Sequence, residues 1–450
     1  MKRLIIISLA LLAGATAMAQ EGESPKQGPW SLADCIDYAL DHNITVRQSA
    51  LNVEQSEVDL NTAQMSRLPS LSASASENLS FGRGLTSENT YSNSNTTATS
   101  FSLGGEVPVF KGFEINNNIK LGKLNLEAAT ADLEKARDDI RVQVAQAYVQ
   151  ILYNRELLRV AGEQRMHDED LLGQIQERER AGKASMAEVS AQQATLAQSR
   201  QSEIEADGNL RLAMLDLTQL LELGSPEGFD VVIPEVGDVA AVLLMNPEDI
   251  YAEAVEVKPA VESAKIGVDY AQLNIAKAKG AYLPSLSLRG GIGTDYYTNS
   301  KMPSSGFLDQ LKNNFSQYVS LSLNIPIFQR FSTRNQVRSA EINYRNQQLN
   351  LENVKKSLYK EIQQAYYNAV NAQARYNGSA ESAESARLHY ELTEEKYSVG
   401  KAGIADYNDA RNSWLRAESE YIQARYQCLY QTKLLDFYRG LPLSFDSVQN

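Results

Sequence analysis

The sequence predicts a mixed protein of long α-helices and membrane β-strands, in which several copies of the chain share one closed barrel. Three observations lead to this prediction. The 450-residue chain begins with an export signal, its second half repeats its first half, and each half holds two amphipathic strands beside two long helical stretches. The combination indicates a tandem-duplicated helix–strand–strand–helix unit.

Residues 1–19 have the form of a secretory signal peptide. Lys2 and Arg3 precede an apolar run at residues 4–12, and an Ala-Met-Ala cleavage site follows at 17–19. Removing Lys2 and Arg3 leaves 41 of the 43 basic residues against 56 acids, a charge of about −15. We therefore expect an exported, acidic protein that binds no nucleic acid.

The rest of the chain contains the same pattern twice. Short motifs return in the same order, 215 or 218 residues later: Leu-Pro-Ser-Leu at 68–71 and 283–286, Pro-x-Phe at 108–110 and 326–328, and Gly-Lys at 182–183 and 400–401. This near-constant offset indicates a tandem duplication. We expect a first repeat at 20–223, a connecting segment at 224–259, a second repeat at 260–440 and a tail at 441–450.

Each repeat has a long proline-free stretch in which we expect a helical hairpin. The expected helices cover about 114–180 and 184–223 in the first repeat, and 332–398 and 404–438 in the second. Apolar residues recur every seven positions, as at Leu126, Leu133, Ile140 and Ala147. This period predicts a continuous seam against neighbouring helices.

Alternating apolar and small polar residues predict two strands per repeat. The expected ranges are about 70–83, 97–110, 285–297 and 315–328. Strands of this kind, apolar on one side, are typical of membrane barrels. Four strands leave unpaired edges, which are costly in lipid, so the chain must oligomerise, and a trimer or larger assembly leaves room for a water-filled passage.

A pair of phenylalanines recurs where the second strand of each repeat meets the following helix. These are Phe110 and Phe113 in the first repeat, and Phe328 and Phe331 in the second. Aromatic residues form girdles where membrane barrels meet water, so we expect contact with outer-membrane lipid there. Ordinary core packing is the alternative for any one of them.

Catalytic chemistry is not expected. The three histidines, His42, His167 and His389, have no metal-ligand spacing, and the sequence contains no nucleophile–base set or phosphate-binding loop. We therefore expect no metal, no cofactor and no enzymatic activity. Cys35 and Cys428 could pair across the chain, but two buried thiols are the favoured interpretation.

Taken in order, the duplicated unit, the Leu-Pro-Ser-Leu entry, the Pro-x-Phe exit and the Tyr-x-Val-Gly turn at 397–400 resemble those of TolC-type outer-membrane efflux proteins. The resemblance implies a homotrimer with a 12-stranded outer-membrane β-barrel continued by a long periplasmic α-helical barrel. Residues 224–259 and the tail would contribute to an equatorial layer.

The resemblance also implies a function. The chain would be a passive export duct of a tripartite efflux or type I secretion system, with a periplasmic adaptor and an inner-membrane pump as partners. A periplasmic or surface coiled-coil scaffold or adhesin is the alternative, which fits the helices but gives no use for the strands. The cargo and the class of pump are not encoded in any motif.

Site residues follow from the resemblance at the second hairpin turn. Asp406 and Asp409 match the acids that constrict the periplasmic mouth, and Ala191 stands opposite Asp409 in the first repeat, so the scaffold itself needs no acid there. The turns, Gly182 with Lys183 and Val399 with Gly400, are expected to contact the adaptor. A helix-capping role for Asp406 is the alternative.

Ties between the hairpins are expected beside this turn. Tyr397 matches a tyrosine that holds neighbouring hairpins together in the closed state, and Glu188 matches its acidic partner. Glu188 also completes a capping box with Ser185, so a cap and a tie are equally supported. Ala402 replaces an arginine that makes a second tie in the family, and Lys401 is the candidate substitute.

Overall fold

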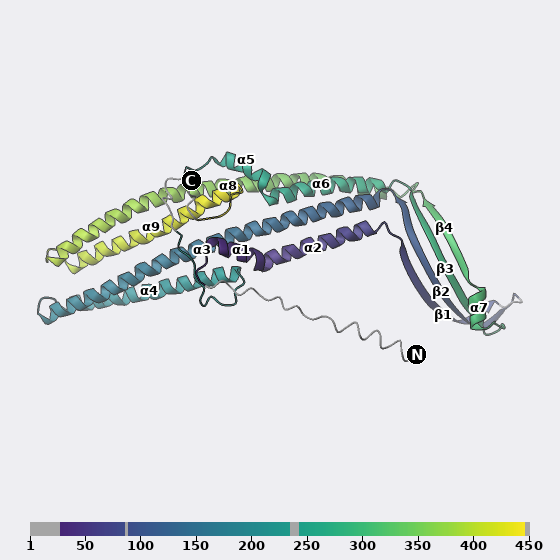
Figure 1. The fold of residues 1–450 in the computed structure, drawn as a ribbon, viewed down its shortest axis with the longest axis horizontal. Helices are drawn as coiled ribbons and strands as arrows, with labels where there is room; N and C mark the ends of the chain where they lie inside the picture. The colour runs from purple at the N-terminus through teal and green to yellow at the C-terminus, as the bar shows by residue number, and fades with distance from the viewer. Residues whose placement is uncertain (1–27, 86–88, 235–242, 446–450) are drawn as a thin grey trace.

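The computed structural model describes residues 28–85, 89–234 and 243–445. The expected signal peptide therefore lies outside the described residues. The molecule is elongated, with a bundle of helices at one end and a single sheet at the other (Figure 1). No helix in the described ranges is both long enough and apolar enough to cross a bilayer.

The sheet has four antiparallel strands in sequence order: β1 Ser70–Leu85, β2 Tyr91–Lys111, β3 Ser285–Asn299 and β4 Ser316–Asn324. Its register places the apolar residues of neighbouring strands together, with Ala73 opposite Leu103 and Leu103 opposite Ile292. The serines lie together too, and the hydroxyls of Ser74 and Ser102 are 2.7 Å apart. The alternation in the sequence thus gives two faces of different polarity.

Three details of the sheet differ from the expected pattern. β1 and β2 extend into the expected polar loop between them, and a short helix, α7 (Phe307–Asn313), occupies the second expected loop. β4 ends at Asn324 because Pro326 has no N–H to donate to a ladder. The matching Pro108 stays within β2, where the register shifts between Pro108 and Phe110.

Four helices form the two hairpins: α3 Glu114–Arg180, α4 Met186–Leu220, α8 Ser332–Ser398 and α9 Ile404–Tyr438. α3, α8 and α9 have the expected bounds, and α4 is slightly shorter than expected. Shorter helices pack on the sheet-proximal halves of the long ones: α2 (Ile44–Met65) on α3, and α6 (Pro259–Gly280) on both α3 and α8. α3 and α8 are therefore covered by these shorter helices near the sheet and by their hairpin partners, α4 and α9, near the tip (Figure 1).

The predicted seven-residue seam is buried where these helices meet. Leu133 and Ile140 of α3 are buried, and Leu126 and Ala147 are half-buried. Leu358 and Ala365 of α8, which follow Ile140 and Ala147 by 218 residues, are buried too. Burial of such a stripe between helices is the main source of stability for helices of this length.

A hydrophobic core lies across the middle of the helical bundle. It joins α1 (Leu32–His42) to the segment around Val231 and to Phe445 near the end of the chain. α5 (Pro247–Val257) packs on α8 and α9 beside it. Cys35 and Cys428 are both buried and are not joined in a disulfide, so the favoured interpretation of the cysteines is confirmed.

The junction between helices and sheet brings two backbones unusually close. A Cβ on Gly112, which follows β2, would lie 2.3 Å from the carbonyl oxygen of Gly280, and the reverse contact has the same length. Gly112 also has a φ of +56°. Only glycine at both positions allows this approach.

Candidate functional site at the hairpin tips

The two hairpin turns have the same geometry. In each, a glycine adopts a left-handed conformation, with φ +68° at Gly182 and +74° at Gly400. The next residue, Lys183 or Lys401, donates its amide to the carbonyl five residues earlier, at 2.7 and 2.8 Å. This is the Schellman closure of a helix end. Both lysines and Val399 are exposed at the tip, where a partner could reach them.

The acidic residues that follow the turns cap their own helices. The Glu188 carboxylate accepts from the Ser185 hydroxyl at 3.1 Å, and the Glu188 amide donates back to that hydroxyl at 3.2 Å. Asp406 accepts from the amide of Gly403 at 3.1 Å. Asp409 lies three residues further along α9 and is exposed. Within one chain, Glu188 therefore acts as a cap and does not reach Tyr397.

Tyr397 contacts a different residue of the first hairpin. Arg178 donates to its hydroxyl at 3.4 Å, with the guanidinium carbon 5.7 Å from the ring centroid. The ring of Tyr397 packs against Tyr407 at 5.1 Å. Arg178 was not expected from the sequence, because a basic residue in the last turn of a helix already has a local explanation in the helix dipole. Lys401 forms no ion pair with any described residue.

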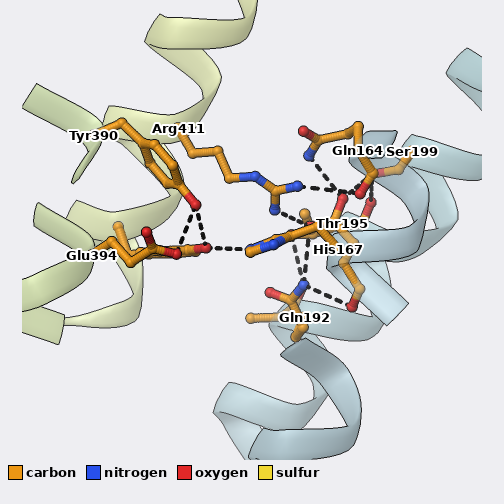
Figure 2. Close-up of polar contacts among 11 residues, drawn as sticks. Gln164, His167, Gln192, Thr195, Ser199, Tyr390, Glu394 and Arg411 are labelled. Atoms are coloured by element: carbon orange, nitrogen blue, oxygen red, sulfur yellow. Dashed lines mark hydrogen bonds and ion pairs between the residues drawn. The ribbon is translucent and has the colours of Figure 1, made fainter. Parts of the chain in front are cut away.

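Further from the tip, a buried ion pair joins the two hairpins (Figure 2). Asp168 of α3 is 0% exposed, Arg411 of α9 is 3% exposed, and Nη1 of the arginine lies 2.5 Å from Oδ1 of the aspartate. The second guanidinium nitrogen donates to the backbone carbonyl of Gln164 at 3.2 Å. These hydrogen bonds fix the orientation of both the guanidinium and the carboxylate in the buried pair.

Three side chains of the first hairpin complete the surroundings of Asp168. Gln164 donates to Oδ2 at 2.9 Å, Gln192 donates to Oδ1 at 3.3 Å, and the Ser199 hydroxyl donates to Oδ2. Each carboxylate oxygen thus receives donors from α3 or α4 before Arg411 is counted. We call Asp168, Gln164, Gln192 and Ser199 the Asp168 socket.

A second set of contacts lies beside the socket. Tyr407 of α9 shares a hydrogen bond with Nε2 of His167, and its hydroxyl is 3.1 Å from that of Tyr390. Tyr390 in turn donates to Glu394 at 2.9 Å, and its ring stacks on Trp414 at 5.1 Å. Three aromatic rings and a histidine therefore meet on one side of the ion pair.

Burial and charge both act on His167. Burial lowers the pKa of its imidazole, and the nearby Arg411 lowers it further, against smaller opposing effects of the acidic neighbours Asp168, Glu394 and Asp170. Burial also raises the pKa of the Tyr407 phenol. The histidine and the tyrosine are thus both neutral at neutral pH.

The sequence does carry a signal for this site. The seven-residue seam of Leu126, Leu133 and Ile140 continues to Asp168, which stands five heptads after Leu133. A charged residue at a seam position predicts a buried charge that needs a partner. Arg411 has no comparable signal, because α9 carries several arginines.

The four phenylalanines lie at the other end of the helices. Phe110 and Phe113 form an edge-to-face pair with ring centroids 5.3 Å apart, and Phe328 and Phe331 form another at 5.7 Å. Phe113, Phe328 and Phe331 are 54%, 72% and 60% exposed in the single chain. Their rings are therefore available at the boundary between helices and sheet.

A duplicated helical hairpin, with two of the sheet's four strands at one end of each copy, defines the subunit of an outer-membrane channel. The chain belongs to the outer membrane efflux protein family, whose pattern matches residues 35–222 and again 250–440. The two matches fall on the two repeats.

Individual relatives agree with this assignment. The chain is 25% identical to outer membrane protein TolC of Escherichia coli over 453 residues, which covers 95% of this chain and 84% of TolC. Its fold matches that of a membrane protein from Pseudomonas aeruginosa with a TM-score of 0.74 at 20% identity, covering 91% and 92% of the two chains. It also matches the open state of the Neisseria gonorrhoeae MtrE outer membrane channel, with a TM-score of 0.70 at 19% identity, covering 92% and 89%. The protein is an outer-membrane export duct that extends into the periplasm.

Proposed function

We propose that three copies of the chain form one duct, which acts passively and without catalytic chemistry of its own. The observation that supports this most strongly is the sheet. β1 and β4 are its two edges, and apolar residues on them are widely exposed, with Leu71 at 74% and Val319 at 81%. Three sheets joined edge to edge give a closed 12-stranded barrel with no unpaired edge in lipid. Phe110, Phe113, Phe328 and Phe331 then form the periplasmic aromatic girdle.

The helical half has a surface suited to the same assembly. Ala187, Ala191, Ala194 and Ala197 lie along α4, and all four are exposed in the single chain. Small side chains allow helices to approach closely. We assign this face of α4 to contact with a neighbouring subunit, which continues the barrel as a ring of helices.

The tips are the proposed docking site for a periplasmic adaptor that links the duct to an inner-membrane pump. Gly182, Lys183, Val399 and Gly400 form the two turns, and the turns have equivalent backbone geometry. An adaptor that recognises one turn by its backbone and its lysine would therefore find a second, similar turn in every subunit.

The mouth between the tips is the proposed gate. Threefold symmetry would bring six carboxylates, from Asp406 and Asp409, around a narrow bore, where mutual repulsion favours bound cations. Tyr397 holds α8–α9 to α3–α4 through Arg178 in this proposal. Among the described residues, Glu188 and Lys401 form no side-chain hydrogen bond or ion pair with the other hairpin of the same chain, so a tie through either would run to a neighbouring subunit.

Single-channel recording in planar bilayers tests the proposal. The purified wild-type protein should insert, conduct poorly and prefer cations. Asp406→Asn combined with Asp409→Asn should reduce that preference, because both charges are lost while asparagine can still accept the cap hydrogen bond. Tyr397→Phe should open more often.

Glu420→Gln is the matched control, since Glu420 is an exposed acid on α9 far from the tip. Its selectivity should equal that of the wild type. A double variant with the same selectivity as this control would remove the gate assignment. A purified protein that forms no oligomer and no pore would remove the duct.

A further inference from the structure

We infer that Arg411 and the Asp168 socket form the latch that keeps the two hairpins of one chain together, and that the mouth opens when this latch separates. The inference rests on the proposed function, because it assumes that separation of the hairpins opens the duct. It assigns the main closing contact to a buried site and not to the tip.

The latch lies where the hairpins meet. α3 and α9 are in contact. Arg411 of α9 extends toward the first hairpin (Figure 2), where its guanidinium donates to Asp168 of α3. Asp168 precedes the end of α3 at Arg180 by 12 residues, so the latch lies roughly 18 Å from the tip. Beyond it, the hairpins meet in an apolar cluster that includes Ile175 and Tyr407, and the longer, partly exposed hydrogen bond of Arg178 to Tyr397 lies nearer the tip.

The duplication supplies an internal control for the role of the socket. Asp168, Gln192 and Ser199 correspond, 218 residues later, to Ala386, Ala410 and Ala417. Alanines at the three equivalent positions of the second hairpin show that the hairpin scaffold itself packs without polar groups there. The socket therefore serves a partner outside its own hairpin, and that partner is Arg411.

The contacts divide cleanly between the two bodies. Gln164, Gln192 and Ser199 donate to Asp168 within the first hairpin, and Tyr390 donates to Glu394 within the second. Among the described residues around the socket, the hydrogen bonds that cross between the hairpins are those of Arg411 to Asp168 and Gln164 and that of Tyr407 with His167. Separation breaks these few bonds together, which gives a two-state contact and not a gradual one.

Buried charge makes the closed state the favoured one. Moving Arg411 away leaves a fully buried carboxylate without its counter-ion, which is much costlier than parting a surface pair. A cavity of about 280 Å³ lined by His167, Arg411 and Trp414 adjoins the pair. Water entering from this side could hydrate the separated charges, so the latch can part when an external partner pulls on the tips.

The test is the open probability of single channels formed by the full-length protein. Arg411→Met keeps an unbranched side chain in the buried position and removes the charge. We expect its open probability to rise about tenfold or more, since loss of one member of a buried ion pair is strongly unfavourable. Arg416→Met, an exposed arginine on the same helix, should match the wild type.

Two further variants keep the test decisive. The double change Asp168→Asn with Arg411→Met removes the uncompensated charge, so the oligomer should be as heat-stable as the wild type while the channel stays leaky. Tyr407→Phe keeps its ring and should raise opening by a smaller factor. A structural role alone would lower heat stability without changing opening at lower temperature.

The outcomes separate cleanly. An assembled Arg411→Met channel that opens no more often than Arg416→Met overturns the latch. If that single variant does not assemble, a double variant or a Tyr407→Phe channel with wild-type opening overturns it. A wild-type protein that never forms pores contradicts the proposed duct instead. In that case the latch variants should have the same solubility and oligomeric state as the wild type.

Discussion

The junction between the sheet and the helices predicts an unusual sensitivity to single methyl groups. Alanine at Gly280 would place a Cβ 2.3 Å from the carbonyl oxygen of Gly112, and alanine at Gly112 would make the same contact in reverse. Both clashes involve backbone atoms, which cannot rotate away as a side chain can. The backbones of the two connections therefore have to move apart.

The cost can be worked out for each position. Overpacking of one methyl group costs about 1–3 kcal/mol, which is the expected loss for Gly280→Ala. Gly112 also has a φ of +56°, which adds about 1–2 kcal/mol for a residue with a Cβ. We expect Gly112→Ala to lose roughly 2–5 kcal/mol in total. The double variant should lose less than the sum, because the first alanine already opens the gap.

Heat dissociation of the detergent-solubilised oligomer measures the effect. The dissociation temperature should fall in the order wild type, Gly280→Ala, Gly112→Ala, with a smaller yield of assembled protein. Gly173→Ala is the matched control, since no atom lies within 4 Å of the added methyl group and alanine favours the helix interior. If Gly280→Ala and Gly173→Ala dissociate at the same temperature, the close approach does not limit assembly and the argument is wrong.

Three other expectations follow from the described contacts. Tyr148→Phe should lower the unfolding free energy by about 1–3 kcal/mol, seen as a lower thermal midpoint, because the buried hydroxyl donates to the Val232 carbonyl at 2.5 Å; an unchanged midpoint would contradict this. Lys258→Met should cost about 1–2 kcal/mol in the same assay, since its ammonium lies 3.1 Å from Asp138 and 3.6 Å from the Phe437 ring centroid; no loss would mean that neither contact stabilises the fold. Burial lowers the pKa of His167 from 6.5, so the packed hairpins resist protonation and the separated state takes up the proton first as pH falls below about 6.5; channel opening should therefore rise on acidification, and a His167→Gln channel with the same pH response would refute this.

The sequence predicted those helices and strands whose local pattern of prolines and apolar residues has only one compatible structure. Proline spacing placed α3, α8 and α9, because a proline-free stretch with a seven-residue apolar period has few alternatives. The end of β4 was predicted too late, since Pro108 and Pro326 occupy matching positions but only the first is accommodated by a bulge. A proline in a strand does not itself say which of the two outcomes occurs.

The site was less predictable, for a physical reason. The glycine turns were expected, because a left-handed helix end has a strong sequence preference. Glu188 was assigned equally to a cap and a tie, and only the three-dimensional structure shows which neighbour its carboxylate reaches. Arg178 and Arg411 were not identified, because pairing between residues more than 200 positions apart leaves no local pattern. Asp168 could have been found by extending the seam.

The asymmetry between the two halves of the chain has a consequence for mixed assemblies. The two hairpins are similar, yet the acid belongs to one and the arginine to the other. Both members of the ion pair are therefore encoded in the same polypeptide. If the proposed trimer is correct, rings built from wild-type and Arg411→Met chains would carry zero, one, two or three subunits without the ion pair. Co-expression could thus grade the leak in steps, and the number of steps would count the chains around the axis.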